Sequence, residues 1–207
     1  MHSSIVFDTS ANLILENERV LLRPLVQEDA VLLAAYVKNE PSLWKYALTP
    51  IVTEQDLEKY IAIAIEARNS GTAFPFIVFD KLNNKYVGST RFYDIQHQFK
   101  TTQLGYTWYS EATWGTGLNE HCKFLLLNFA FETIGFERVE FRADNRNKRS
   151  IAAMQKIGCT IEGILRNHLP TSDGTRRDSI VLSMLKEEWP TIKAGFLART
   201  KKLDQNK

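Results

Sequence analysis

The sequence has very little cysteine and no long apolar run, and each absence excludes a class of protein. Of the 207 residues only Cys122 and Cys159 are cysteines, with no Cys-x-x-Cys pair and no Cys/His spacing suited to zinc. We therefore expect a reduced, cytoplasmic chain with both thiols packed inside and no metal site. No apolar run approaches the roughly 18–20 residues of a membrane-spanning helix. Residues 1–10 also lack the pattern of a secretion signal.

Neither sign of charge dominates the chain. The 26 Lys and Arg residues against 24 Asp and Glu give a net charge of +2, which predicts no nucleic-acid partner and no membrane partner. A hydrophobic fraction of 44% over 207 residues suits one domain with a full core. The first dozen residues and the segment 199–207 offer little apolar surface to bury, so we expect them to be unstructured ends.

Hydrophobic periodicity predicts an α/β protein in which two helices follow the first strand. Strands are expected over 19–25, 74–79, 86–93, 103–109, 139–143, 160–165 and 178–184. Helices are expected over 27–38, 53–69, 118–134 and 150–157. The helix 118–134 is apolar around nearly its whole circumference, which predicts a central position between layers.

The loop that joins the strand 103–109 to the helix 118–134 contains Gly115 and Gly117. Unpaired amides at a helix N-terminus carry about half a positive charge, and glycine lets a ligand approach the backbone. The order strand, glycine loop, helix therefore predicts a phosphate or pyrophosphate cradle. The alternative is a tight loop that needs glycine only for its turn.

Two other phosphate motifs are excluded, and a second basic segment remains. Leu118-Asn119 stands where a Walker loop needs Lys-Ser/Thr, and Glu120 stands where a dinucleotide fingerprint needs its third glycine. Between residues 145 and 160 there are four basic residues and no acid. This surplus suits the phosphates of a nucleotide-bearing cofactor. A solvated face with Asn147 or Ser150 as a helix cap is the alternative.

The glycine loop resembles the acetyl-CoA loop of the GCN5-related N-acetyltransferase (GNAT) superfamily. The family pattern Q/R-x-x-G-x-G/A falls on residues 114–119, with Trp114 and Asn119 replacing its first and last positions. Within that superfamily the chain is similar to the RimJ/RimL branch, which acetylates protein amino termini and many small amines. The resemblance runs from about residue 21 to residue 184.

A second signature of that branch, Asn-x-x-Ser ahead of a helix that ends in Lys-x-Gly, falls on Asn147, Ser150, Lys156 and Gly158. The resemblance implies a single-domain GNAT fold: an α/β fold with a mixed, mostly antiparallel sheet splayed at the acetyl-CoA site and helices on both faces. It implies an N-terminal extension over 1–17, an acetyltransferase domain over 18–186, and a C-terminal helix with a charged tail over 187–207.

The resemblance also implies an activity and its co-substrate. The chain is expected to be an acetyl-CoA-dependent N-acetyltransferase that acts by direct attack of a primary amine, without a metal, as a monomer or homodimer. A catalytically idle domain that senses acyl-CoA is the alternative. The implied cofactor contacts are two strand-edge residues, the loop and the second signature: Trp108, Tyr109, Trp114, Gly115, Thr116, Gly117, Leu118, Asn119, Asn147 and Ser150.

Three residues are candidates for the chemistry. The resemblance makes Ser150 the donor to the departing thiolate, because Met154 stands where many members have a tyrosine. Glu111 and His168 are alternative bases for the ammonium proton, and the glutamate of RimL-like enzymes aligns with Leu169. Aromatic residues including Tyr93, Trp108 and Trp44 are expected either to line an acceptor channel or to pack in the core.

Overall fold

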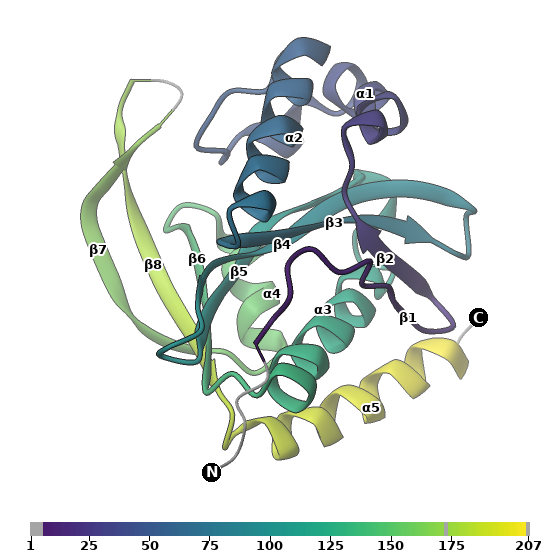
Figure 1. Ribbon diagram of the computed structural model, residues 1–207, viewed down its shortest axis with the longest axis vertical. Coiled ribbons are helices and arrows are strands. Elements are labelled where there is room, and N and C mark those ends of the chain that lie inside the picture. The colour runs from purple at the N-terminus through teal and green to yellow at the C-terminus, as the bar shows by residue number, and fades with distance from the viewer. Residues whose placement is uncertain (1–5, 172–173, 206–207) are drawn as a thin grey trace.

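The computed structural model describes residues 6–171 and 174–205 and shows one sheet of eight strands covered by helices (Figure 1). The strand order across the sheet is β1-β2-β3-β4-β5-β6-β8-β7. The strands are β1 (Leu15–Glu16), β2 (Val20–Pro24), β3 (Ala73–Asp80), β4 (Lys85–Gln96), β5 (Thr101–Tyr109), β6 (Arg138–Asp144), β7 (Thr160–Pro170) and β8 (Arg176–Leu185). β5 and β6 are parallel, whereas the other neighbouring strands are antiparallel.

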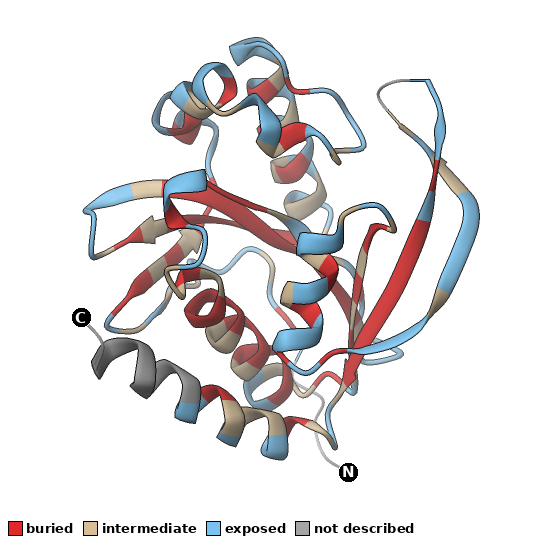
Figure 2. Ribbon diagram, turned by 180° about the vertical axis from the view of Figure 1, so that it is seen from behind, coloured by how far each residue is buried: buried red, intermediate tan, exposed pale blue. Residues whose placement is uncertain are grey.

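Helices lie on both faces of this sheet (Figure 1). They are α1 (Ala30–Asn39), α2 (Glu54–Asn69), α3 (Leu118–Asn128), α4 (Lys148–Lys156) and α5 (Trp189–Gln205). One hydrophobic cluster joins α1 and α2 to the sheet, and a larger one joins the opposite face to α3, α4 and α5. The sheet is therefore the middle layer, with buried strand centres and exposed outer helix faces (Figure 2). The predicted fold class is confirmed.

The start of α2 shows how local sequence sets a boundary. The Thr53 hydroxyl accepts a hydrogen bond from the Asp56 N–H at 3.2 Å, and the Asp56 carboxylate accepts one from the Thr53 N–H at 2.9 Å. This reciprocal capping box satisfies two donors that a helix start leaves unpaired. Leu57, Ile61 and Ala64 then bury one face of the helix, as the periodicity predicts.

The parallel pair β5 and β6 separates part-way along its length. Thr101–Gln103 pairs with Arg138–Glu140, and from Leu104 onward β5 has no partner on the β6 side. A bulge at Tyr106, whose φ of 49° lies in the left-handed region, interrupts the pairing of β5 with β4. Bulges bend a strand and increase its twist. The sheet is therefore open between the later halves of β5 and β6, and we call this opening the splay.

Both ends of the chain were expected to be unstructured, and the described parts of both are ordered. Phe7 is only 3% exposed and packs against Phe74 and Phe129, each with ring centroids 5.2 Å away. Helix α5 continues to Gln205, so the expected tail over 199–207 is helical over 199–205. Residues 1–5 and 206–207 lie outside the described residues. The Phe7 ring packs into the tertiary core, and the composition of the N-terminal segment does not indicate that contact.

The predicted central helix also ends differently from expectation. The α-helix stops at Asn128, and Phe129–Ile134 forms a π-helix that ends at Gly135, whose φ is 78°.

Cys122 and Cys159 are buried free thiols, as expected. No described helix is both long enough and apolar enough to cross a bilayer.

Candidate functional site

The loop between β5 and α3 presents main-chain donors at the end of the splay. Gly115 and Gly117 have φ values of 75° and 86°, in the left-handed region where a side chain is strained, and Gly117 is the N-cap of α3. Within the described chain, the N–H groups of Gly115, Gly117, Leu118 and Asn119 donate no hydrogen bond. A Cβ atom added to Gly115 would meet open space. The loop can therefore receive an anion.

The carboxylate of Glu40, at the end of α1, holds this loop in place. It accepts hydrogen bonds from the Ser110 hydroxyl at 2.8 Å and from the Glu111 N–H at 2.6 Å. The Trp114 indole donates to the carbonyl of Tyr109 at 3.0 Å. Glu40 was not predicted from the sequence, because it lies 70 residues before Ser110 and no local motif marks it.

The two cofactor-binding segments predicted from sequence lie side by side in the structure. The Arg149 guanidinium stacks on the Trp114 ring, 3.3 Å from its centroid. Burial lowers the pKa of Arg149, and the nearby Glu111 carboxylate opposes this shift. The loop 114–119 and the start of α4 are thus in direct contact, although about 30 residues separate them along the chain.

At the start of α4, Asn147 and Ser150 of the second signature have different roles. Asn147 is the N-cap, and its side-chain oxygen accepts a hydrogen bond from the Ser150 N–H at 3.1 Å. The half-buried Ser150 hydroxyl makes no hydrogen bond with any described residue. The cap is therefore Asn147, and the Ser150 hydroxyl is available to a ligand. Met154 is buried in the core and offers no alternative proton donor.

The side chains of Trp108 and Tyr109 lie in the core on opposite faces of the sheet. Residues 27–69, which contain α1 and α2, form what we call the helical arm. Trp108 packs beneath this arm against Trp44, with ring centroids 4.7 Å apart. Tyr109 belongs to the hydrophobic cluster on the α3 side. Of the expected channel residues, Trp44 and Trp108 are thus packing residues. At the open edge of β5, Trp108 and Tyr109 can therefore contact a ligand only through their main-chain groups.

The two candidate bases lie in different parts of the structure. Glu111 is exposed at the end of β5, where its carboxylate accepts a hydrogen bond from the Ser42 hydroxyl of the helical arm. His168 lies on β7, and its Nδ1 is 3.0 Å from the Ser179 hydroxyl. Burial lowers the pKa of His168, and nearby arginines lower it further, so its neutral form is favoured near pH 7.

A group of arginines and tyrosines on the α2 face of the sheet was not found from sequence. It comprises Arg91 and Tyr93 on β4, Tyr106 on β5, Arg142 on β6 and Arg177 on β8, and we call it the arginine–tyrosine cluster. Its members come from four strands, and none belongs to a local motif. Tertiary pairing alone brings them together beside the splay.

A buried lysine lies on the opposite face of the sheet. Lys123 of α3 is 5% exposed, and its Nζ donates to the Thr107 hydroxyl of β5 at 3.0 Å. The same nitrogen lies 5.8 Å from the centroid of the Phe141 ring on β6. Burial lowers the pKa of Lys123 to about 8. The lysine amine therefore lies beneath the splay, between its two strands.

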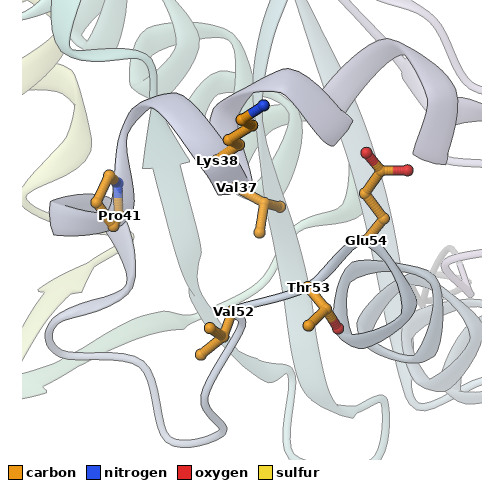
Figure 3. Close-up of a pocket in the computed structure, with 6 residues that line it drawn as sticks. All are labelled: Val37, Lys38, Pro41, Val52, Thr53 and Glu54. Carbon is orange, nitrogen blue, oxygen red and sulfur yellow. The ribbon is translucent and has the colours of Figure 1, made fainter.

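A surface hollow of about 430 Å³ lies away from these groups, between the end of α1 and the start of α2 (Figure 3). Its lining residues are Val37, Lys38, Pro41, Val52, Thr53 and Glu54. It contains none of the residues predicted for chemistry or cofactor binding. Among the described residues, no group of three or more His, Cys, Asp or Glu side chains is arranged to hold a metal ion.

Comparison with known proteins assigns the chain to a family. The model of the acetyltransferase (GNAT) domain matches residues 19–160. The chain belongs to the GNAT acetyltransferase family. "Uncharacterized N-acetyltransferase p20" of Bacillus licheniformis is 26% identical over 176 residues, which are 84% of this chain and 97% of that protein. The family resemblance read from the sequence is therefore confirmed.

Solved structures agree with this assignment. A GCN5-related N-acetyltransferase from Brucella melitensis has a TM-score of 0.83 and 26% identity, covering 91% of this chain and 85% of that one. A putative acetyltransferase from T. thermophilus has a TM-score of 0.81 and 29% identity, covering 90% and 96%. Mycobacterium smegmatis RimJ, solved with CoA-disulfide, has a TM-score of 0.75 at 20% identity over 88% and 89%, and shows the same fold.

The GNAT chain is thus an acetyl-CoA-dependent acetyltransferase, and its own residues fit that co-substrate. The four unused N–H groups at the start of α3 suit a pyrophosphate, because aligned amides and the helix dipole both favour negative charge there. The open edge of β5 offers further main-chain groups. The substitutions at Trp114 and Asn119 leave these four N–H groups unused.

Proposed function

We propose that this GNAT chain transfers the acetyl group of acetyl-CoA to a primary amine by direct attack in a ternary complex. The observation that carries this proposal is the splay, which opens between β5 and β6 and ends at the unused N–H groups of the loop. A thioester carrier needs a slot for its amide-containing arm and an anion site for its diphosphate. The splay could hold the arm and the N–H groups of the loop could bind the diphosphate, and the loop directly follows β5 along the chain.

The cofactor-binding residues divide into main-chain and side-chain contacts under this proposal. Trp108 and Tyr109 contribute the strand edge through their backbone, since their rings are buried. Residues 114–119 bind the diphosphate through N–H groups. Asn147 acts indirectly, because its side chain caps α4 and thereby positions Ser150.

The chemical step requires two proton movements. A C–N bond forms as the amine nitrogen attacks the thioester carbonyl, and the C–S bond breaks with its electron pair on sulfur. We assign the Ser150 hydroxyl to donate a proton to that sulfur, because it has no described partner of its own, and the resulting alkoxide takes a proton back from solvent. The ammonium proton goes to a base, for which Glu111 and His168 both remain candidates.

Two classes of acceptor are open under this proposal. A relative named "Putative ribosomal N-acetyltransferase YdaF" from Bacillus subtilis, 28% identical over 49% of this chain and 55% of that protein, supports a ribosomal acceptor, for which we propose a protein amino terminus. A small-molecule amine is the other class. The acceptor side of the splay is formed by the helical arm and the β7–β8 hairpin, which stands apart from α2 (Figure 1).

A coupled thiol-release assay tests the proposal. The purified full-length chain is incubated with acetyl-CoA and a panel of small amines and peptides with free amino termini, and acetylated products are identified by mass spectrometry. We expect thiol release that depends on one class of amine, together with acetyl-CoA binding by calorimetry. Binding without turnover on any amine would instead indicate an acyl-CoA sensor.

A further inference from the structure

The arginine–tyrosine cluster holds two buried guanidinium groups that no carboxylate neutralises among the described residues. Arg91 is 5% exposed and Arg177 is 8% exposed. Neither forms an ion pair with any residue that the structure describes. Buried charges are normally paired, because an ion that loses its hydration without gaining a partner destabilises the fold. Two such groups in one cluster are therefore unusual for a part of the protein that only supports the fold.

Aromatic rings hold Arg91 in place without neutralising it. Its guanidinium lies 3.7 Å from the centroid of the Tyr106 ring and 4.9 Å from that of Tyr60 on α2. Tyr93 packs edge-on against Tyr106, with centroids 5.0 Å apart. Gly105 allows this arrangement, because a Cβ at that position would lie 3.0 Å from the Tyr93 ring. The cation is thus oriented by stacking, and its side-chain N–H groups donate no hydrogen bond to a described residue.

Arg177 is also fixed through one nitrogen only. Its Nε donates to the Ser179 hydroxyl at 3.0 Å, the same hydroxyl that lies 3.0 Å from His168 Nδ1. Its two terminal nitrogens make no hydrogen bond within the described part of the chain. Tyr93, Tyr106 and Arg142 are close enough to influence its charge. A forked donor pair is therefore left free in the middle of the cluster.

The acidic groups around the cluster are already occupied. The two oxygens of Glu140 accept from Arg142 at 2.6 Å and from Arg138 at 2.8 Å. Those of Asp144 accept from Arg146 at 3.0 and 2.8 Å. The remaining charge is positive, and burial lowers the pKa of Arg177 despite the nearby Asp144. Among the residues that the structure describes, no carboxylate is therefore left to pair with Arg177.

We propose that the acceptor of this enzyme carries a carboxylate a few bonds from its reactive amine, and that Arg177 binds this carboxylate while Arg91 adds positive charge to the same cluster. The inference rests on the proposed acetyl transfer, since it concerns the acceptor of that same site. Tyr106 on β5 and Arg142 on β6 lie just beyond the last paired residues of the two strands, so the cluster borders the splay. A planar guanidinium binds a carboxylate through two parallel N–H donors.

The test compares acceptors that differ only in charge. The ratio of kcat/KM for β-alanine to that for β-alaninamide is measured in the wild type and in Arg177→Gln, so that the different basicities of the two amines cancel. The same ratio is measured for peptides that begin with Asp or Asn, which separates a small acceptor from a protein amino terminus. We expect the wild type to favour the carboxylate by at least about tenfold and Arg177→Gln to lose most of that preference.

Two further variants separate recognition from folding. Lys186→Gln removes one positive charge from an exposed pair with Glu137 and should leave the ratio unchanged. Arg177→Lys keeps the charge but not the fork, and should keep part of the preference. The melting temperature and the acetyl-CoA affinity of each variant report whether the fold and the cofactor site are intact. If Arg177→Gln does not fold, Arg177→Lys and Arg91→Gln carry the comparison.

A readout without turnover distinguishes this inference from the proposed function. A carboxylate bound to Arg177 should shift the NMR signal of the neighbouring His168 ring, and the neutral amide should not. If no amine is acetylated but β-alanine still shifts that signal, the acetyl-transfer proposal fails and the anion site stands. If amines are acetylated with the same ratio in the wild type and Arg177→Gln, or neutral amines are preferred in the wild type, the inference is wrong.

Discussion

In the proposed chemical step, the Ser150 hydroxyl donates to the departing thiolate. It lies at the start of α4, half-buried and without a described hydrogen-bond partner, whereas the Met154 thioether on the same helix has no proton to donate. We expect Ser150→Ala to lower kcat by about 10²-fold or more, the usual contribution of general acid catalysis. Acetyl-CoA affinity should change little, because the loop amides remain.

The matched control for this change is Ser150→Thr, which keeps a hydroxyl and should retain part of the activity. Steady-state kinetics and calorimetry separate the effects on kcat and on cofactor binding. Full activity in Ser150→Ala would remove this residue from the mechanism and return attention to water as the proton donor.

The buried charge of Lys123 makes the stability of the fold depend on pH. Its pKa is about 8 in the folded protein against 10.5 for an ordinary lysine, so the unfolded state binds more protons between these values. The contribution of Lys123 to the free energy of unfolding therefore rises with pH across that window, by about 3 kcal/mol at about 1.4 kcal/mol per pKa unit. Above about pH 9 the buried thiols of Cys122 and Cys159 oppose this rise, because burial raises the pKa of each to about 12. Below pH 8 the buried charge destabilises the fold by that full amount.

We therefore expect Lys123→Met to stabilise the protein at pH 7 by about 2–3 kcal/mol and to flatten the rise between about pH 8 and pH 10. Urea unfolding at several pH values measures both effects. The exposed Lys186→Met serves as the control and should leave the profile unchanged. A profile with the same slope in Lys123→Met and the wild type would contradict the assignment.

At the scale of elements, we propose that the loop and the first turn of α3 act as one anion-binding unit. Gly117 has a φ of 86°, so Gly117→Ala strains the backbone and tilts the first N–H groups of the helix. We expect a stability loss of about 1 kcal/mol and a much weaker acetyl-CoA affinity. Thermal unfolding and calorimetry give the two quantities.

Gly135→Ala is the control for strain alone. Its φ is 78°, nearly the same as that of Gly117, but it ends the π-helix far along the chain from the loop. It should lose similar stability and keep its acetyl-CoA affinity. Equal affinities in the two variants would mean that the cradle lies elsewhere.

At the scale of the whole molecule, the N-terminal segment closes the core that supports α3. Phe7 packs against rings from β3, β4 and the π-helix, whereas its neighbour Val6 is 65% exposed. We expect Phe7→Ala to destabilise the fold by about 3–5 kcal/mol, the usual range for a buried phenylalanine. Val6→Ala should change the stability by less than about 0.5 kcal/mol. Equal melting temperatures for the two variants would contradict the packing.

Local sequence predicted most elements because it contains their start and stop signals. The capping box at Thr53 places the start of α2, and Gly117 places the start of α3. The loop 114–119 and the segment 147–158 were also predicted, since each is a contiguous motif. The π-helix after Asn128 was missed, because its hydrophobic pattern is compatible with a continued α-helix.

The order of elements, the glycine loop and the family of this protein were determined by the sequence itself, because each depends on residues that are neighbours along the chain. The anchoring of the loop by Glu40, the placement of Lys123 beneath the splay and the gathering of Arg91 and Arg177 were decided only by the tertiary structure. These groups are brought together by strand pairing and helix packing between distant segments. Their burial and their contacts, which give them chemical meaning, exist only once the chain has folded.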